Sequence, residues 1–356
     1  MDMNKILRCS VLLSAWCAVA ASAGQASTVA AQSAAAAPVA TFNYGMTDFV
    51  QNGTTIYATV PSLNSIAEIN PSTLQAKLIG IGSNPEGLAL NSGGTTLYVA
   101  NQGSNFIATL NTQTNQVGSP ISLGSGVSPL DVQVGTNGRL WVLTGAQDQF
   151  DSIEQISAAT GASTGPGIGA YGGQIVTSPN GATLYYGNFG VSPSSEYQFN
   201  VSSTDPSVTW TSSLGGNGTS VDLSNDGTLV AFPQGGNAQN AIIQTSTGLT
   251  LGSVQSATSI AFSPDNSIAY TANSLIQGIR GFSTTTFLQT VNIPTVGNPG
   301  TLFVNNSGNY IFSDEGGSTE VYQTGAVPDA ATIYLLLLGI AGTCLLRHRR
   351  LCCIVV

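Results

Sequence analysis

Positive charge is scarce in this chain. Of its 356 residues, 8 are Lys or Arg and 17 are Asp or Glu, which gives a formal net charge of −9. Between residues 24 and 326 the basic residues are Lys77, Arg139 and Arg280. An acidic body of this kind repels phosphate backbones, so the composition excludes nucleic acid as a partner.

Histidine is also nearly absent. The sole histidine, His348, lies in a basic cluster close to the C-terminus. The body therefore contains neither a Ser-His-Asp nor a Cys-His catalytic arrangement, and no zinc, copper or iron site with histidine ligands. We expect a protein that is not an enzyme and has no such cofactor.

Cysteine is missing from the body as well, because all five cysteines lie near the two ends: Cys9, Cys17, Cys344, Cys352 and Cys353. Without disulfides the body must be stabilised by packing and by sheet hydrogen bonds. The chain has 42 Gly and 42% hydrophobic residues. This composition suits short strands and tight turns and differs from that of disordered proteins.

The N-terminus has the features of a secretory signal peptide. Lys5 and Arg8 precede an apolar stretch at residues 9–20, and Ala21-Ser22-Ala23 forms a cleavage site of the A-x-A type. We predict a signal peptide at residues 1–23, followed by an Ala-rich linker at residues 24–37. The mature protein should therefore be exported.

The C-terminal segment, residues 327–356, combines three features. Val327-Pro328-Asp329 comes first, an uncharged apolar run at residues 333–346 follows, and Arg347, Arg349 and Arg350 then form a basic cluster. This order resembles the PEP-CTERM sorting tail of exported bacterial surface proteins. The resemblance implies contact with a sorting machinery and an association with exopolysaccharide.

A permanent membrane anchor is the alternative for this tail. Residues 330–346 reach the lower limit of about 17 residues for a spanning helix. The three arginines on its cytoplasmic side would obey the positive-inside rule. Both interpretations place the protein in the cell envelope, on the outer surface or outside the cell.

A unit of about forty residues repeats seven times through the body, which is typical of a propeller. Each unit has a turn followed by a strand with an aromatic residue; examples are Asn52-Gly53, Asn180-Gly181 and Asp226-Gly227. Such dipeptides favour type I′ hairpins, in which both central residues have positive φ. Four short strands fit in each unit, so we predict an all-β, seven-bladed β-propeller of four-stranded antiparallel blades at residues 38–326.

The repeat also carries a family signature. Tyr98-Val99-Ala100-Asn101, Tyr270-Thr271-Ala272-Asn273 and Tyr185-Tyr186-Gly187-Asn188 resemble the Tyr-Val-Thr-Asn motif of the YVTN family of β-propeller repeats. The fifth unit departs from the motif, with Leu229-Val230-Ala231-Phe232. The seventh unit has room for three strands, so we expect residues 38–44 to supply its outer strand and to close the ring.

Alignment of the units brings polar residues to the first strands, which line the central channel of a propeller. The candidate ligand-binding residues are Asp48, Glu86, Asp131, Gln174 and Asp222. They would form a polar, acidic pocket for Ca²⁺ or for sugar hydroxyls, or they are solvated channel residues without a ligand. A second calcium candidate is the acidic loop with Asp148, Asp151 and Glu154, although its spacing is not that of an EF-hand.

From these features we expect an exported, non-catalytic binding or scaffold protein whose partner is a polysaccharide or a surface protein. Aromatic residues in rim loops either stack on sugar rings or pack between blades; they are Phe150, Tyr171, Phe189 and Tyr197. The alternative is a propeller lactonase or lyase that uses the channel carboxylates with Arg139 or Arg280.

Overall fold

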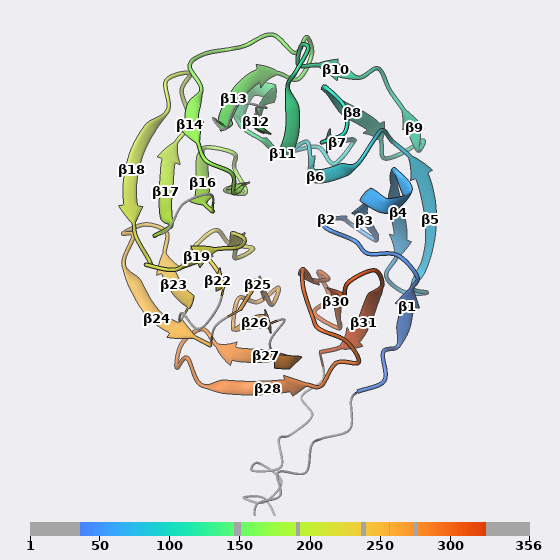
Figure 1. Ribbon diagram of the computed structural model, residues 1–356, viewed down its shortest axis with the longest axis vertical. Helices are drawn as coiled ribbons and strands as arrows, with labels where there is room; N and C mark the ends of the chain where they lie inside the picture. Colours follow the sequence, from blue (N-terminus) through green and yellow to red (C-terminus); the bar gives the residue numbers. More distant parts are fainter. Residues whose placement is uncertain are drawn as a thin grey trace, which may run out of the picture. The chain divides into compact units, whose positions relative to one another are not determined.

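The chain folds into seven antiparallel sheets around a central opening (Figure 1). The computed structural model describes residues 36–145, 151–189, 193–235, 240–255, 257–273 and 276–324. Apart from two short 3₁₀ turns, η1 (Pro61–Leu63) and η2 (Thr136–Gly138), the regular elements in this part of the chain are strands. The predicted seven-bladed β-propeller is thereby confirmed.

Each blade has four strand positions, and we number the blades along the chain. Blade 1 contains β2 (Phe49–Asn52), β3 (Thr55–Val60), β4 (Ser65–Asn70) and β5 (Gln75–Gly80). Blade 2 contains β6 (Pro85–Leu90), β7 (Thr96–Asn101), β8 (Phe106–Asn111) and, sharing the outer position, β9 (Gln116–Val117) and β10 (Ile121–Ser122). Blade 3 contains β11 (Ser128–Val134), β12 (Arg139–Gly145), β13 (Asp151–Ser157) and β14 (Ile168–Ala170).

The other four blades have the same order from the centre outwards. Blades 4 to 7 contain the following strands: β15 (Gln174–Thr177), β16 (Thr183–Asn188), β17 (Ser195–Asn200) and β18 (Ser207–Ser212); β20 (Asp222–Leu223), β21 (Leu229–Ala231), β23 (Asn240–Gln244) and β24 (Thr250–Val254); β25 (Ser259–Phe262), β26 (Ile268–Asn273), β27 (Ile276–Ser283) and β28 (Gln289–Ile293); β29 (Leu302–Val304), β30 (Tyr310–Asp314), β31 (Thr319–Gln323) and β1 (Ala40–Phe42).

The ring is closed by the first strand of the chain. β1 pairs antiparallel with β31, with Ala40 opposite Val321 and Phe42 opposite Thr319. The expected outer strand of the last blade is therefore confirmed. Contact with the ring begins before this strand, since the Ala36 N–H donates to the Pro294 carbonyl at 2.8 Å.

The hairpin turns differ from the prediction in six blades; in blade 1, Gly53 but not Asn52 has a positive φ. In blade 4 the Gly181 N–H donates to the Ser178 carbonyl at 2.7 Å, and Gly181 but not Asn180 has a positive φ. The same bond recurs in blades 2, 5, 6 and 7 as Gly94–Asn91, Gly227–Ser224, Asn266–Ser263 and Gly308–Asn305. These are type I turns followed by one left-handed residue, which is why a single Gly or Asn suffices. The predicted pair of positive φ values occurs in blade 3, at Asn137 and Gly138.

Blade 5 is the irregular one, as its sequence indicated. Its second strand, β21, has 3 residues, and Pro233 follows shortly after it, where a missing N–H cannot continue the ladder. The chain then forms β22 (Gln234–Gly235), which pairs with β19 (Asn217–Gly218) in a separate two-stranded ladder.

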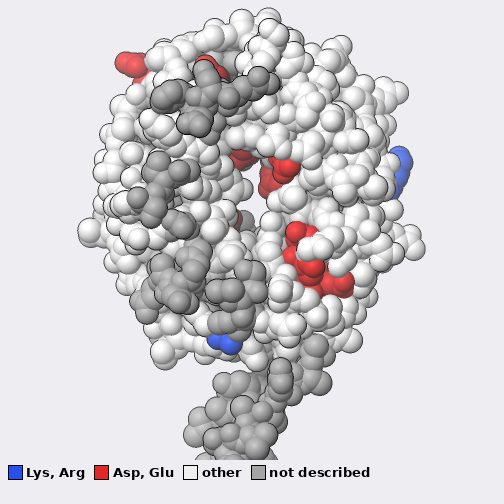
Figure 2. All heavy atoms as spheres, viewed as in Figure 1, with Lys and Arg blue, Asp and Glu red and all other residues white. Residues whose placement is uncertain are grey.

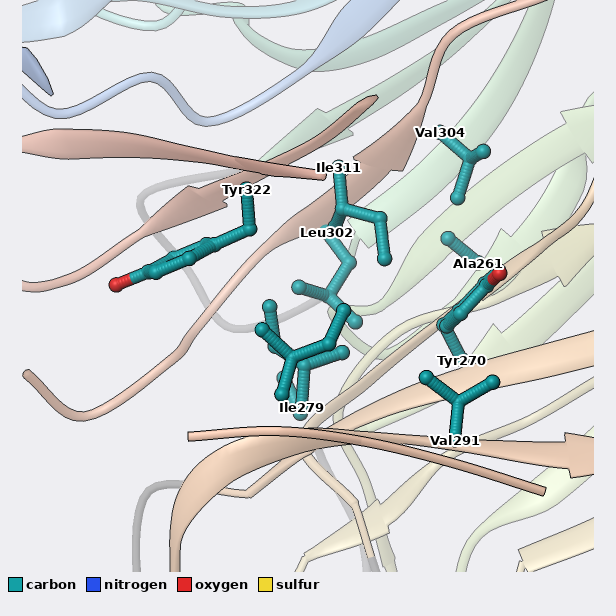
Figure 3. Packing of buried hydrophobic residues seen from close by; sticks show 10 residues of the cluster. Ala261, Tyr270, Ile279, Val291, Leu302, Val304, Ile311 and Tyr322 are labelled. Atoms are coloured by element: carbon teal, nitrogen blue, oxygen red, sulfur yellow. The ribbon is translucent and has the colours of Figure 1, made fainter. Parts of the chain in front are cut away.

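The hydrophobic core lies between neighbouring blades rather than at the centre of the ring. Between blades 6 and 7, Tyr270, Ile279, Leu302 and Tyr322 pack in one cluster (Figure 3). Burial of each such aliphatic or aromatic side chain stabilises the fold by roughly 1.5–3 kcal/mol. Because the packed layers hold the blades in place, the inner strands leave an open space on the axis.

Candidate functional site

A cavity of about 740 Å³ occupies the centre of the ring. It is lined by the first strands of the blades, by the residues directly before them and by some residues that follow strands, such as the blade 4 turn at residues 178–181. Figure 2 shows acidic side chains around the opening on this face. Among the described residues that line the cavity, none is Lys, Arg or His.

The structure brings together the five residues predicted for the channel. The cavity wall includes Asp48, Glu86, Asp131, Gln174 and Asp222. They stand at or next to the first strands of blades 1, 2, 3, 4 and 5. The alignment of turns in the sequence was therefore sufficient to place them.

Asp48 links blade 1 to blade 2. Its Oδ2 atom accepts a hydrogen bond from the Leu88 N–H at 2.8 Å, and its Oδ1 atom accepts one from the adjacent Phe49 N–H at 2.8 Å. Both oxygens are thus engaged by the backbone. We call such a bond from a first-strand side chain to the next blade an inter-blade clip.

Two further aspartates form the same clip. Asp131 Oδ2 accepts from the Ile175 N–H of blade 4 at 3.1 Å, and Oδ1 accepts from its neighbour Val132 at 2.7 Å. Asp222 Oδ2 accepts from the Phe262 N–H of blade 6 at 3.2 Å. These carboxylates satisfy buried backbone donors, which leaves them fewer sites for a ligand.

Neutral side chains form clips at two more boundaries. Gln174 Oε1 accepts from the Val221 N–H at 3.0 Å, and Ser259 Oγ accepts from the Leu302 N–H at 3.1 Å. The clip residues are therefore bonded to the neighbouring blade, and Asp48, Gln174 and Asp222 remain partly exposed on the channel wall. The sequence held a signal for this role, because each donor follows its acceptor by about one repeat.

The carboxyl groups of the channel hold their protons more tightly than free ones. Burial raises the pKa of Asp48 to about 7, against the lowering effect of the Leu88 and Phe49 N–H groups, and nearby Glu86 raises it further. Burial likewise raises the pKa of Asp222 to about 7 and that of Asp131 well above its usual range. The charge on Asp48 adds to both shifts across the channel.

Glu86 is the channel carboxylate that forms no backbone clip. The Asn84 Nδ2 donates to its Oε1 at 3.0 Å, and the side chain is half-buried. Burial raises its pKa, while hydrogen bonds from Asn84 and Thr47 lower it. Glu86 is therefore the acidic group best placed to meet a ligand.

Aromatic rings also line the cavity. Phe49 and Phe303 stack with a centroid separation of 5.2 Å. Phe189 is wedged against Gly187 and Gly218, where an added Cβ would lie 2.5 Å and 2.2 Å from its ring. Of the other rim aromatics, Tyr197 stacks between Tyr186 and Phe199, Tyr171 is 46% exposed, and Phe150 lies outside the described residues.

A second acidic group lies beside the opening, over blade 7 (Figure 2). Glu315 accepts from the Tyr322 hydroxyl at 2.8 Å, and Glu320 accepts from Thr41 Oγ1 on β1 at 2.5 Å. The Glu320 bond ties the closing strand β1 to blade 7, and the Glu315 bond holds the loop after β30 against β31. We therefore assign this group to ring closure.

The predicted calcium loop is described in part. Asp148 lies outside the described residues, and Asp151 begins β13, but its side chain is not described. Glu154 Oε1 accepts from Ser152 Oγ at 2.7 Å. Among the described residues, no group of three or more His, Cys, Asp or Glu side chains is arranged to hold a metal ion.

The two body arginines lie away from the cavity. Arg139 is buried and donates to the Ser203 carbonyl of blade 4 and to Thr136 Oγ1 at 2.9 Å. Arg280 donates to Gln255 Oε1. Neither residue lines the cavity, so the structure does not bring them to the channel carboxylates.

The N-terminal 35 residues and the tail from residue 325 lie outside the described residues, including Val327, Pro328 and the arginines of the basic cluster. In the described part of the chain, no helix has the length and apolar character needed to cross a membrane.

Comparison with known proteins shows the fold. No family model and no curated protein matches the sequence. Among solved structures, hydrazine synthase of Kuenenia stuttgartiensis is similar with a TM-score of 0.66 and 15% identity, over 85% of this chain and 99% of that one. The β-propeller domain of Myceliophteria thermophila Cps50 (Swd1) is similar with a TM-score of 0.65 and 10% identity, over 80% of this chain and 98% of that one. At these identities the likeness shows that the chain is a β-propeller.

Proposed function

We propose that the chain is an exported, non-catalytic binding or scaffold protein of the bacterial cell envelope, outer surface or extracellular matrix. Its N-terminal signal features, its YVTN-like repeats and its PEP-CTERM-like tail support export and a surface role. The central cavity supplies the binding site. The tail resemblance favours a role linked to exopolysaccharide.

The charge of the cavity wall carries this proposal. Four carboxyl groups line the wall, and no basic side chain is among the described lining residues. A wall of one sign disfavours anions and accepts neutral polyhydroxylated or cationic groups. Phe49, Phe303 and Phe189 add apolar faces of the kind on which sugar rings and organic cations pack.

The clips argue against acid–base chemistry as the main role. Asp48 and Asp131 each engage both oxygens with backbone N–H groups, so their first task is to hold blades together. A ligand meets the remaining polar groups, above all Glu86. Binding then requires no rearrangement of the ring.

The proposal is tested with the full-length protein on a glycan array, followed by thermal-shift titration of each glycan that is retained. We expect retention of neutral or amino-bearing glycans and none of sulfated or uronate-rich ones. Glu86→Gln should weaken binding, whereas Glu154→Gln, a carboxylate away from the cavity, should leave it unchanged. Retention of anionic glycans alone, or equal effects of the two substitutions, would refute the proposal.

A lactonase or lyase remains the second candidate for one reason. A carboxyl group with a pKa of about 7, such as Asp48 or Asp222, suits a general acid or base at neutral pH. Hydrolysis of lactone substrates that disappears in Asp222→Asn, while the thermal midpoint is retained, would favour this candidate over a binding protein.

A further inference from the structure

A second polar groove lies between blades 4 and 5 and adjoins the central cavity, since Ser178, Pro179 and Asn180 belong to both walls. It has a volume of about 420 Å³ and is lined by the turns after β15, β20 and β23 and by side chains of β16 and β17. This volume lies within the range of ~300–1,000 Å³ of small-ligand pockets. The groove opens among the hairpin turns, at the ends of the first strands remote from the channel carboxylates.

The repeat provides an internal comparison for this groove. At one position of the repeat, three blades pair an aromatic residue of the second strand with Glu or Gln of the third: Tyr57 with Glu68, Trp141 with Gln155, and Tyr185 with Gln198. In each case the pair faces the turn between the third and fourth strands of the next blade. The three boundaries differ in what occupies this place.

Two of the boundaries are filled by the protein itself. Between blades 1 and 2, Asn115 Nδ2 donates to both carboxylate oxygens of Glu68 at 2.8 Å. Between blades 3 and 4, the Arg139 guanidinium reaches across to the Ser203 carbonyl, and Gln155 Nε2 donates to the Thr204 carbonyl at 2.7 Å. A ligand would have to displace these contacts.

At the boundary of blades 4 and 5 the contacts to the next blade are made by Gln198 and by Trp210, whose ring lies over the turn, and a groove stays open beside them. The position equivalent to Asn115 is Gly248, where an added Cβ would lie 2.8 Å from the Trp210 ring. Gln198 is 6% exposed, and its Nε2 donates to the Thr245 carbonyl at 2.8 Å and to the Tyr185 hydroxyl at 3.0 Å. Because a carbonyl can only accept, the orientation of this amide is fixed.

The fixed amide leaves an acceptor at the groove. Gln198 lines the groove, and both of its side-chain hydrogen bonds to described residues are donated by Nε2, so Oε1 keeps no partner among them. Asn180, Thr183 and Ser246 add amide and hydroxyl groups, and Pro179 adds an apolar ring. Asp226 is the one charged residue of the wall. Oriented amides, hydroxyls and a carboxylate beside an apolar face match the alternating hydroxyl and C–H surface of a pyranose.

We propose that this groove binds one saccharide unit of a neutral glycan, beside the central cavity.

Titration of the full-length protein with the methyl glycosides of glucose, galactose, mannose and N-acetylglucosamine tests the proposal. Trp210 reports on the groove, since its Nε1 donates to the same Thr245 carbonyl at 3.0 Å. We expect at least one glycoside to saturate a change in tryptophan fluorescence below about 100 mM, the weak range usual for ligands with few atoms.

Two substitutions assign the binding to the groove. Ser246→Arg places a long side chain from an exposed position into the groove, and Gln198→Met removes the oriented acceptor; each should weaken binding about tenfold. Gln113→Arg is the matched control, because Gln113 holds the position in blade 2 that Ser246 holds in blade 5. Each follows a threonine, Thr112 or Thr245, whose hydroxyl donates to the carbonyl of the turn glycine of its own blade. It should leave the affinity unchanged.

Saturation by none of the four glycosides overturns the proposal. So does wild-type affinity in Ser246→Arg, or an equal loss in Gln113→Arg. A loss of affinity in Gln198→Met counts as support only if the thermal midpoint of that variant is unchanged. If Gln198→Met does not fold, the comparison of Ser246→Arg with Gln113→Arg decides the question.

Discussion

We expect the ring to lose stability as the pH rises from about 5 to about 8, because two partly exposed clip carboxyls on the channel wall ionise within this range. Burial raises the pKa of Asp48 and Asp222 to about 7. In the unfolded chain both groups ionise near pH 3.9. The folded state therefore binds these protons more tightly than the unfolded state does.

The sign of the effect follows from this difference. Stability from these groups is fully present below the unfolded pKa, declines as the pH rises, and levels off above the folded pKa. Between pH 5 and pH 8 each group should remove about 2.5 kcal/mol, and the two together about 5 kcal/mol. For a domain of this size, the melting temperature should fall by roughly 10 °C.

The assay is thermal unfolding of the full-length protein at constant ionic strength across this pH range. Asp48→Asn combined with Asp222→Asn removes both titrations, so the melting temperature should become nearly independent of pH. Asp265→Asn is the control, because hydrogen bonds from Ser263 and Ser267 lower the pKa of Asp265, an exposed turn residue. Its effect should be the same at both ends of the range.

A wild-type melting temperature that is flat or rises from about pH 5 to about pH 8 would contradict the reasoning. An unchanged pH slope in the double variant would show that the clip carboxyls stay ionised, with enough hydration to offset their burial.

Three further outcomes are expected. Deletion of residues 38–44 should lower the melting temperature of the whole ring, because it exposes the edge of β31; an unchanged midpoint would show that β1 is not a clasp. Mass spectrometry of the exported protein should find an N-terminus at or near Gly24, and an intact N-terminus would contradict this. Replacement of the three tail arginines by neutral residues should change the cell fraction that contains the protein, and unchanged fractionation would contradict this. Millimolar Ca²⁺ should raise the melting temperature modestly, because it binds the folded state. The rise should be smaller in the variant in which Asp131 and Asp222 are both changed to Asn. Equal rises in the wild type and this variant would place the ion elsewhere, such as the acidic loop with Asp148.

The repeat made the fold predictable. Turn residues at a spacing of about forty fix the number of blades, and the missing fourth strand of the last unit implies that an earlier segment completes it. The pairing of β1 with β31 confirms this reasoning. The residues on the cavity wall followed from the same alignment, because equivalent positions in a repeat occupy equivalent places in the ring.

The chemical roles of these residues were harder to predict. An aspartate at the start of a first strand has the same appearance in the sequence whether it binds a ligand or accepts the N–H of the next blade. Asp131 is assigned to the second role by the Ile175 N–H, 44 residues further along the chain. The turn type was wrong for a similar reason, since Asn-Gly fits both a type I′ turn and the end of a type I turn.

Departures from the repeat are therefore more informative about function than the repeat itself. A residue that recurs in each blade serves the ring, whereas a position that breaks the pattern at one boundary has another cause. Glu86 forms no clip, although it lies on the cavity wall with residues that do. The groove beside Gln198 lacks the Asn115–Glu68 and Arg139–Ser203 contacts of its two counterparts. Both departures expose polar groups that the ring does not need for its own stability. Substitutions at Glu86 and Ser246 should therefore change binding with little effect on folding, whereas substitutions at Asp48 or Asp131 should change folding first.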